Sequence, residues 1–296
     1  MALRWADIPG WTTDDHAAAL AAFSVTADLF GMTVEVEPSQ ARAFFETQFE
    51  PVEIAPSGAA HFTGYYEPEV IGSRQRGGAF THPLYAKPDG IEPDQPWFPR
   101  AEIRERNLLA GQEIVYLDSA IEAFLAQVQG SIRVRLTEGG SVRLGFAGKN
   151  GQPYHSIGKE LVARGVATVS EMTTDFIRSW CSMNPDLVEE LLDTNPSFVF
   201  FRELDLPETS GPIGALGRPV TAGRSLAVDP DVITLGSPVW IDCESVPSRL
   251  MIAQDIGSAI KGVGRGDIFV GTGDEAGRQA GAINQTGRMI VLRRRS

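Results

Sequence analysis

Two stretches in the C-terminal quarter of the chain decide the fold: LAVDPDVITLGSPVWI (residues 226–241) and LMIAQDIGSAIKGVGRGDIFVGTGDEAG (residues 250–277). Short apolar runs alternate there with Gly and Pro turns, a pattern typical of short β-strands. An aspartate stands at the edge of three of these runs, namely Asp229, Asp255 and Asp267. A carboxylate at a strand end can be partly desolvated and carry the raised pKa that a general acid needs. Each aspartate alone is better explained as a turn residue, but the three together favour a functional site.

The loop between Asp255 and Asp267 is rich in glycine and contains one lysine, Lys261. Its backbone N–H groups and this lysine could face a cleft beside the two carboxylates. Lys261 could pair with Asp255, contact a substrate or form a plain surface ion pair. Asp229 stands in a VDP context that fits a structural turn equally well.

The spacing of the remaining runs predicts a small closed barrel. The expected strands are SFVFFRE (197–203), RPVTAG (218–223), SLAVD (225–229), PVWID (238–242), RLMIAQD (249–255), DIFVG (267–271) and RMIVLRR (288–294). The first fifty residues are expected to be helical, with Ser39 capping the second helix. The middle of the chain mixes helices with a hairpin over 131–148. We therefore expect a mainly β, α+β protein in which an α+β lobe is inserted into a barrel.

Composition excludes several classes of protein. The chain has 296 residues and a net charge of −12, which argues against a nucleic-acid partner. No apolar run reaches the length of a membrane span. The four histidines show no metal-ligand spacing, so we expect neither a metal nor a cofactor. The two cysteines, Cys181 and Cys243, leave one bridge or two free thiols open.

Two further segments carry dense polar and aromatic groups. FTGYYEPEV (62–70) is an aromatic strand for which core packing and ligand contact are about equally plausible. AGKNGQPYHSIGKEL (147–161) opens a helix, and its amide, hydroxyl and aromatic groups suit sugar recognition. It could also be only a loop and a helix start. QGS (129–131) is better explained as a helix end than as a contact.

Taken together, these motifs resemble the membrane-bound lytic transglycosylase A family. The resemblance rests on FTGYYEP (62–68), VQGS (128–131), GKNGQPYHSIGKEL (148–161), NPSFVFF (195–201), GRSLAVDPDVITLGSPVWI (223–241) and AQDIGSAIKGVGRGDIFVGTGDEAG (253–277). It implies a double-psi β-barrel made of residues 1–66 and 203–296. It also implies a substrate-binding domain inserted at 67–202 and a deep groove between the two.

The resemblance further implies an activity. The substrate would be peptidoglycan, cleaved between N-acetylmuramic acid and N-acetylglucosamine to leave a 1,6-anhydromuramic acid end. Asp267 would act as the general acid and then as the base, with Asp255 in support. The implied substrate-binding residues are Thr63, Tyr65, Gln129, Gly148, Asn150, Tyr154, Ser156, Asp229 and Lys261.

Members of that family act on the periplasmic side of the bacterial envelope and are often lipoproteins. The N-terminus MALRWADIPGW shows neither a signal peptide nor a lipidated cysteine. We expect a monomeric mature domain whose attachment to the outer membrane, through a lipid anchor, would lie outside this chain.

Two other functions stay open. A hydrolytic glycosidase on the same barrel would need a second carboxylate to activate water, and Asp255 or Glu67 could serve. A glycan-binding module without catalysis predicts instead that Asp267 is solvated and unpaired. An aspartic protease, suggested by QDIGS, would need a second catalytic loop that the sequence lacks.

Overall fold

The computed structural model describes residues 3–92, 95–207, 210–244 and 246–295. Contacts divide the chain into two compact units. One consists of Met1–Tyr66 together with Pro207–Ser296, and the other of Glu67–Leu206. We call them the barrel unit and the inserted unit.

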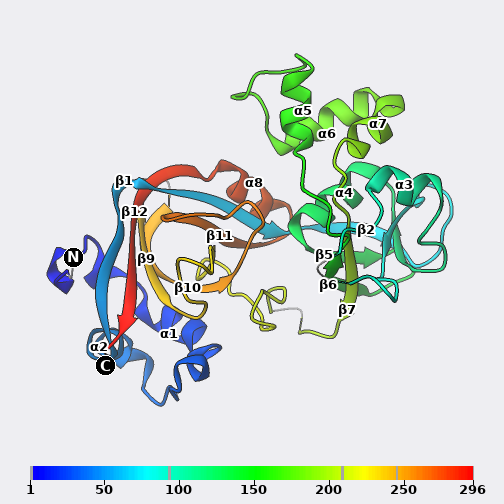
Figure 1. Ribbon diagram of the computed structural model, residues 1–296. Coiled ribbons are helices and arrows are strands. Elements are labelled where there is room, and N and C mark those ends of the chain that lie inside the picture. Colours follow the sequence, from blue (N-terminus) through cyan, green and yellow to red (C-terminus); the bar gives the residue numbers. More distant parts are fainter. Residues whose placement is uncertain (1–2, 93–94, 208–209, 245, 296) are drawn as a thin grey trace. The chain divides into compact units, whose positions relative to one another are not determined.

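Six strands of the barrel unit close into a barrel in the order β1, β11, β8, β10, β9 and β12 (Figure 1). Their bounds are Phe49–Glu67 (β1), Ser225–Val228 (β8), Pro238–Cys243 (β9), Val246–Asp255 (β10), Arg265–Thr272 (β11) and Asn284–Arg294 (β12). The first strand, β1, pairs with the last, β12, and β10 runs parallel to β8. Closure removes the free sheet edges that would otherwise be exposed.

The interior of the barrel is filled by apolar side chains from these strands. Phe62, Leu226, Ile241, Met251 and Met289 are all fully buried in one cluster. Because side chains alternate between the two faces of a strand, the polar residues next to them can face outward. The runs SLAVD and RLMIAQD thus form strands because they fill this core.

The N-terminal helices α1 (His16–Ser24) and α2 (Ala41–Gln48) bury a second apolar cluster with the barrel. Phe23 and Phe45 pack there with Trp240 of β9. Asp15 caps α1 by accepting from the backbone N–H of Ala18 at 3.0 Å. The barrel unit also contains α8 (Asp274–Ala282) and the 3-10 turns η1 (Trp5–Asp7), η2 (Trp11–Thr13), η3 (Ala27–Phe30) and η4 (Pro38–Gln40).

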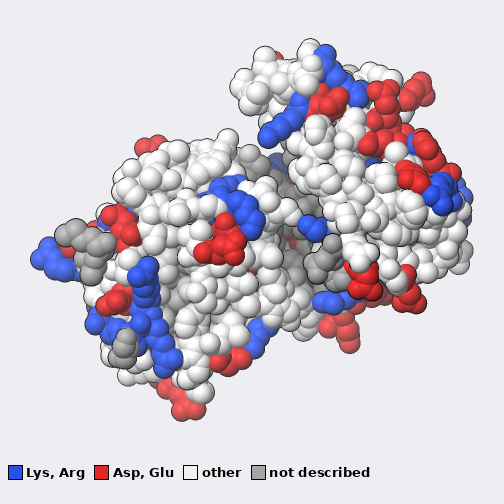
Figure 2. All heavy atoms as spheres, viewed as in Figure 1, with Lys and Arg blue, Asp and Glu red and all other residues white. Residues whose placement is uncertain are grey.

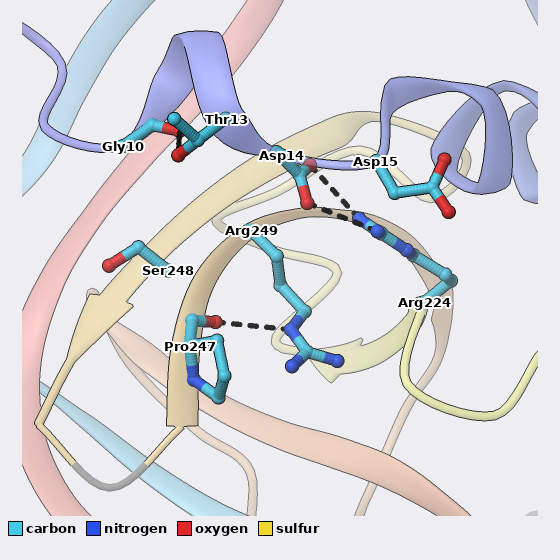
Figure 3. A pocket seen from close by; sticks show the side chains of 8 residues that line it. All are labelled: Gly10, Thr13, Asp14, Asp15, Arg224, Pro247, Ser248 and Arg249. Carbon is cyan, nitrogen blue, oxygen red and sulfur yellow. Dashed lines mark hydrogen bonds and ion pairs between the residues drawn. The ribbon is translucent and has the colours of Figure 1, made fainter.

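An ion pair fastens the segment before α1 to the barrel (Figure 3). The Asp14 carboxylate accepts from both terminal nitrogens of Arg224 at 3.0 Å each and from the backbone N–H of Leu250 at 2.9 Å. Beside it, Arg249 donates from Nε to the carbonyl of Pro247 at 3.1 Å. These side chains line a pocket of about 430 Å³. None of the predicted site residues lines this pocket.

The inserted unit is built on a six-stranded sheet with strand order β3, β4, β2, β5, β6 and β7. The strands are β2 (Glu69–Ser73), β3 (His82–Tyr85), β4 (Glu113–Leu117), β5 (Ser131–Leu136), β6 (Ser141–Lys149) and β7 (Val199–Leu204). The helices are α3 (Arg100–Glu105), α4 (Ala120–Gln129), α5 (Ile157–Ala163), α6 (Thr174–Met183) and α7 (Val188–Asp193), with the turn η5 (Pro185–Leu187). Ala123 and Ala126 of α4 pack on Ile132, Val134 and Leu144 of the sheet.

These two units confirm the predicted mainly β, α+β fold, with a closed barrel and an inserted domain. Three local predictions were wrong. SFVFFRE forms β7 of the inserted sheet, where it pairs with β6, and is not part of the barrel. RPVTAG forms turns, because the Thr221 N–H is taken by the Ser225 hydroxyl at 2.7 Å and Gly223 adopts φ 67°. Ser39 caps no helix, because Pro38 starts a 3-10 turn that contains it and α2 begins only at Ala41.

Candidate active site

Asp267 lies on β11 next to β1, and Thr63 of β1 reaches it. The Thr63 hydroxyl donates to Oδ1 of Asp267 at 2.5 Å. Arg265 donates in turn from Nη2 to the Thr63 hydroxyl oxygen at 2.8 Å. Arg265 and Asp267 stand two residues apart on β11, so their side chains leave the same face of the strand. The result is a hydrogen-bonded chain from Arg265 through Thr63 to Asp267.

Asp255 ends β10 and is held by three donors. Its Oδ2 accepts from the Tyr65 hydroxyl at 2.8 Å. Its Oδ1 accepts from the backbone N–H groups of Ala215 at 3.0 Å and Ile256 at 2.9 Å. The Tyr65 ring packs on Phe269 of β11 with 5.2 Å between ring centroids. Strand β1 therefore supplies a hydroxyl to each of the two carboxylates.

Burial dominates the electrostatics of this pair. Loss of solvation raises the pKa of Asp267 above its usual range, and the negative charge of Asp255 adds to the increase. The Thr63 hydrogen bond and the positive charge of Arg265 act in the opposite direction. Burial likewise raises the pKa of Asp255, against its three hydrogen bonds. Burial and the charge of Asp255 raise the pKa of Tyr65 well above 10, so its phenol stays protonated.

Asp229 is buried and organises the glycine-rich loop. Its carboxylate accepts from the backbone N–H of Gly262 at 2.8 Å, from Nζ of Lys261 at 3.1 Å and from the backbone N–H of Asp231 at 3.3 Å. These donors lower its pKa, the Gly262 bond most. Gly262 has φ 91°, a conformation that favours glycine. The partner of Lys261 is thus Asp229, and Asp229 holds the loop between the other two aspartates.

Three predicted contacts of the inserted unit lie at its helix and strand ends. Asn150 is fully buried; its amide donates to the carbonyls of Phe98 and Pro196, and its Oδ1 accepts from the Phe198 N–H at 2.8 Å. This burial supports a structural role for Asn150 and does not support a direct sugar contact. Gln129 ends α4, and its buried Oε1 has no hydrogen-bond partner within the described part of the chain. Gly148 has φ 151° at a bulge between β6 and β7, where a side chain would meet Lys87.

The last two predicted contacts precede α5. Ser156 is its N-cap and accepts from the backbone N–H of Lys159 at 3.3 Å. Tyr154 is 49% exposed, so part of its surface is accessible to solvent. Of the predicted site residues in the barrel unit, Thr63 lies against Asp267 and Tyr65 lies against Asp255.

Two groups at the site escaped the sequence analysis. The backbone N–H of Ala215 lies in a connecting segment, and no sequence pattern marks it as a donor. Arg265 could have been found, because it occupies the same strand face as Asp267 in GRGD. Within the described residues, no group of three or more His, Cys, Asp or Glu side chains is arranged to hold a metal ion.

The surface carries both signs of charge. On the face drawn in Figure 2, Lys and Arg side chains gather in a band at the lower left of the view and elsewhere lie among Asp and Glu side chains. Acidic side chains outnumber basic ones over the whole chain, which has a net charge of −12.

Comparison with known proteins identifies the class. Residues 61–202 match the family described as "MltA specific insert domain", and residues 224–293 match the "3D domain". Strands β8 to β11, with Asp255 and Asp267, fall within the second match, whereas strand β1 of the barrel lies outside it. Most of the inserted unit falls within the first match. This chain belongs to the MltA family of lytic transglycosylases.

Individual relatives of this chain are also lytic transglycosylases. The "Membrane-bound lytic murein transglycosylase A" of Escherichia coli K12 is 36% identical over 250 residues, which cover 80% of this chain and 66% of the relative. The chain thus spans slightly less than two thirds of that relative's length. The structure of the lytic transglycosylase LtgG of Burkholderia pseudomallei is 41% identical with a TM-score of 0.67, over 100% of this chain and 95% of that one. The structure of E. coli MltA with bound chitohexaose is 30% identical with a TM-score of 0.74, over 95% and 84%.

The curated E. coli relative is described as membrane-bound. In this chain, no helix within the described residues combines the length and apolar character needed to cross a membrane.

Proposed function

We propose that this protein is a peptidoglycan lytic transglycosylase. It would cleave the β-1,4 bond between N-acetylmuramic acid and N-acetylglucosamine and leave a 1,6-anhydromuramic acid end. The observation that carries the proposal is the half-buried Asp267, whose pKa is raised and whose Oδ1 accepts a hydrogen bond from Thr63. A carboxyl group of this kind can stay protonated closer to neutral pH and act as a general acid.

One acid is enough for this reaction. Asp267 would protonate the glycosidic oxygen as its bond to C1 of muramic acid breaks. The C6 hydroxyl of the same sugar would then attack C1 and give its proton back to the Asp267 carboxylate. Intramolecular attack has a large effective molarity, so no activated water is required. Asp255 supports the step because its negative charge raises the pKa of Asp267.

Glycan binding is assigned to both units. Tyr154 offers an exposed ring for a sugar face, and Gln129 offers a buried acceptor without a partner in the described part of the chain. The chitohexaose bound to E. coli MltA indicates the kind of polymer that relatives hold. The negative net charge means that binding relies on hydrogen bonds and ring contacts more than on electrostatic steering. By analogy with its membrane-bound relatives, the protein would act as a monomer on the periplasmic side of the envelope.

The two other functions are less well supported. A hydrolase would need a carboxylate free to activate water. Asp255 already accepts three hydrogen bonds, and Glu67 forms an ion pair with Arg143 at 3.0 Å. A binding module without catalysis predicts a solvated, unpaired Asp267, which its burial and its bond to Thr63 argue against.

The product of digestion tests the proposal. Purified peptidoglycan is digested with the protein, and the released muropeptides are weighed by mass spectrometry. We expect anhydro-ended muropeptides, which are lighter than reducing ones by one water. Reducing ends alone would favour the hydrolase, and no release at all would favour the binding module.

A further inference from the structure

The two carboxyl oxygens of Asp267 are in different environments. Oδ1 accepts the hydrogen bond from Thr63 at 2.5 Å. No hydrogen bond from any described residue reaches Oδ2. A proton on Oδ2 therefore meets no competing donor from the protein, whereas a proton on Oδ1 would have to share its space with the Thr63 hydroxyl.

Arg265 fixes the direction of the Thr63 hydroxyl. A guanidinium group only donates, so the Thr63 oxygen must accept from Arg265. If Asp267 were protonated on Oδ1 and donated to Thr63, the hydrogen of Thr63 would need another acceptor. The described residues provide none within hydrogen-bond distance. The Thr63 hydrogen is thus directed at Oδ1, and the bond from Arg265 polarises the hydroxyl and strengthens its donation.

The hydrogen bonds that Asp255 accepts make it a poorer site than Asp267 for the acid proton. Its two oxygens accept from Tyr65, Ala215 and Ile256. Tyr65 stays protonated and donates its only hydroxyl hydrogen to Asp255. The negative charge of Asp255 raises the pKa of Asp267, and the three hydrogen bonds to Asp255 favour the negative charge there and the proton on Asp267.

We propose that Arg265 and Thr63 are positioning residues that hold the acid proton of the site on Oδ2 of Asp267. This inference rests on the proposed function. In the reaction, the Oδ2 proton moves to the glycosidic oxygen, which keeps the electron pair of the broken C1–O bond. The C6 oxygen forms the new bond to C1, and its proton returns to Oδ2. The acid is restored without water or any co-reactant.

The charged and hydrogen-bonding groups around Asp267 determine the direction in which its pKa should change in each variant. Asp255 of β10 raises its pKa, while Thr63 and His61 of β1 and Arg265 of β11 lower it. Removing the Thr63 hydroxyl or the Arg265 charge therefore raises the pKa of Asp267 further. A free-enzyme acid with a higher pKa stays protonated to higher pH, so the alkaline limb of the kcat/KM profile moves upward.

The test uses the whole protein with Thr63→Val, Thr63→Ser and Arg265→Gln. Arg265 donates to the backbone carbonyls of His61 and Gly266 as well as to Thr63. The control is Arg249→Gln, because Arg249 likewise donates to two backbone carbonyls, those of Pro247 and Gly223. It lies six residues before Asp255, about 20 Å along β10. Two quantities are measured for each variant: the pH profile of anhydromuropeptide release, and the Asp267 carboxyl titration by 13C NMR. The Asp267 signal is assigned by its loss in Asp267→Asn.

We expect Thr63→Val and Arg265→Gln to raise the Asp267 pKa and the alkaline limb by about one pH unit, the size expected for one hydrogen bond to a charged group. Thr63→Ser should restore the wild-type values, and Arg249→Gln should leave them unchanged. An unchanged or lowered pKa in both Thr63→Val and Arg265→Gln would overturn the proposal. If Arg265→Gln fails to fold, the near-isosteric Thr63→Val decides alone. If the wild type releases no anhydro product, the proposed function fails, and the NMR titration still decides whether Thr63 and Arg265 lower the pKa of Asp267.

Discussion

At Asp267 and Asp255, neighbouring residues give one kind of side chain two different chemical states. Both carboxyls are partly removed from solvent, and this burial raises the pKa of each. Asp255 meets three donors and is suited to be the anion. Asp267 meets one donor, Thr63, and is suited to hold the proton. Environments that separate the roles of two neighbouring carboxyls are typical of acid–base sites.

Asp267→Asn keeps the shape of the side chain and removes its titrating proton. We expect turnover to fall by at least ~10²–10⁴-fold, the usual contribution of a general acid–base group, while chitohexaose binding is retained.

The melting temperature of Asp267→Asn should be higher than that of the wild type at neutral pH. A raised native pKa means that the native state binds more protons than the unfolded chain, so the carboxyl costs stability as pH rises above its unfolded pKa. Calorimetry and the muropeptide assay check both effects, with exposed Asp231→Asn as control. If the Asp267→Asn variant retained a third of the wild-type rate, Asp267 would not be the general acid.

At the scale of elements, the sequence predicts what depends on local pattern and fails where a neighbour decides. The apolar runs of β8 to β12 form strands, as their patterns indicate. SFVFFRE is a strand as well, but its membership of the inserted sheet depends on β6, which precedes it by fifty residues. The site shows the same limit: GRGD marks Asp267 and Arg265, whereas the Ala215 N–H that holds Asp255 is positioned only by the tertiary fold.

The glycine-rich loop from Ile256 to Gly264 gives a prediction at this scale. The buried Asp229 carboxylate binds the loop through the Gly262 N–H and Lys261. Asp229→Ala should loosen the loop and lower kcat about tenfold, because loss of a buried hydrogen bond to a charged group is costly. Lys261→Ala should change kcat and KM less than twofold, because an exposed ion pair contributes little. Steady-state kinetics and hydrogen exchange of the loop measure the two effects. A large increase in KM for Lys261→Ala would instead support a substrate contact for Lys261.

At the scale of the whole molecule, chain order connects the two units at two places. The chain leaves the barrel unit after Tyr66 and returns at Pro207. The FTGYYEP strand, which carries Thr63 and Tyr65, therefore runs directly into the inserted unit. Thr63 and Tyr65 thus lie only a few residues before the point where the chain enters the inserted unit.

A crystal structure with bound chitohexaose tests the proposal that both units bind glycan. We expect one oligosaccharide to contact Asp267 of the barrel unit and residues 148–156 of the inserted unit. Tyr154→Ala should weaken chitohexaose binding by about two- to tenfold, the range of a single aromatic contact, as measured by calorimetric titration. Met183→Ala is the matched control, because Met183 is a comparably exposed apolar residue on α6 of the same unit. Unchanged binding in Tyr154→Ala, together with a loop too far from Asp267 for one oligosaccharide to span, would disprove the sugar-contact role of residues 148–156. The catalytic role of Asp267 would stand, because it depends on Thr63, Arg265 and Asp255 within the barrel unit alone.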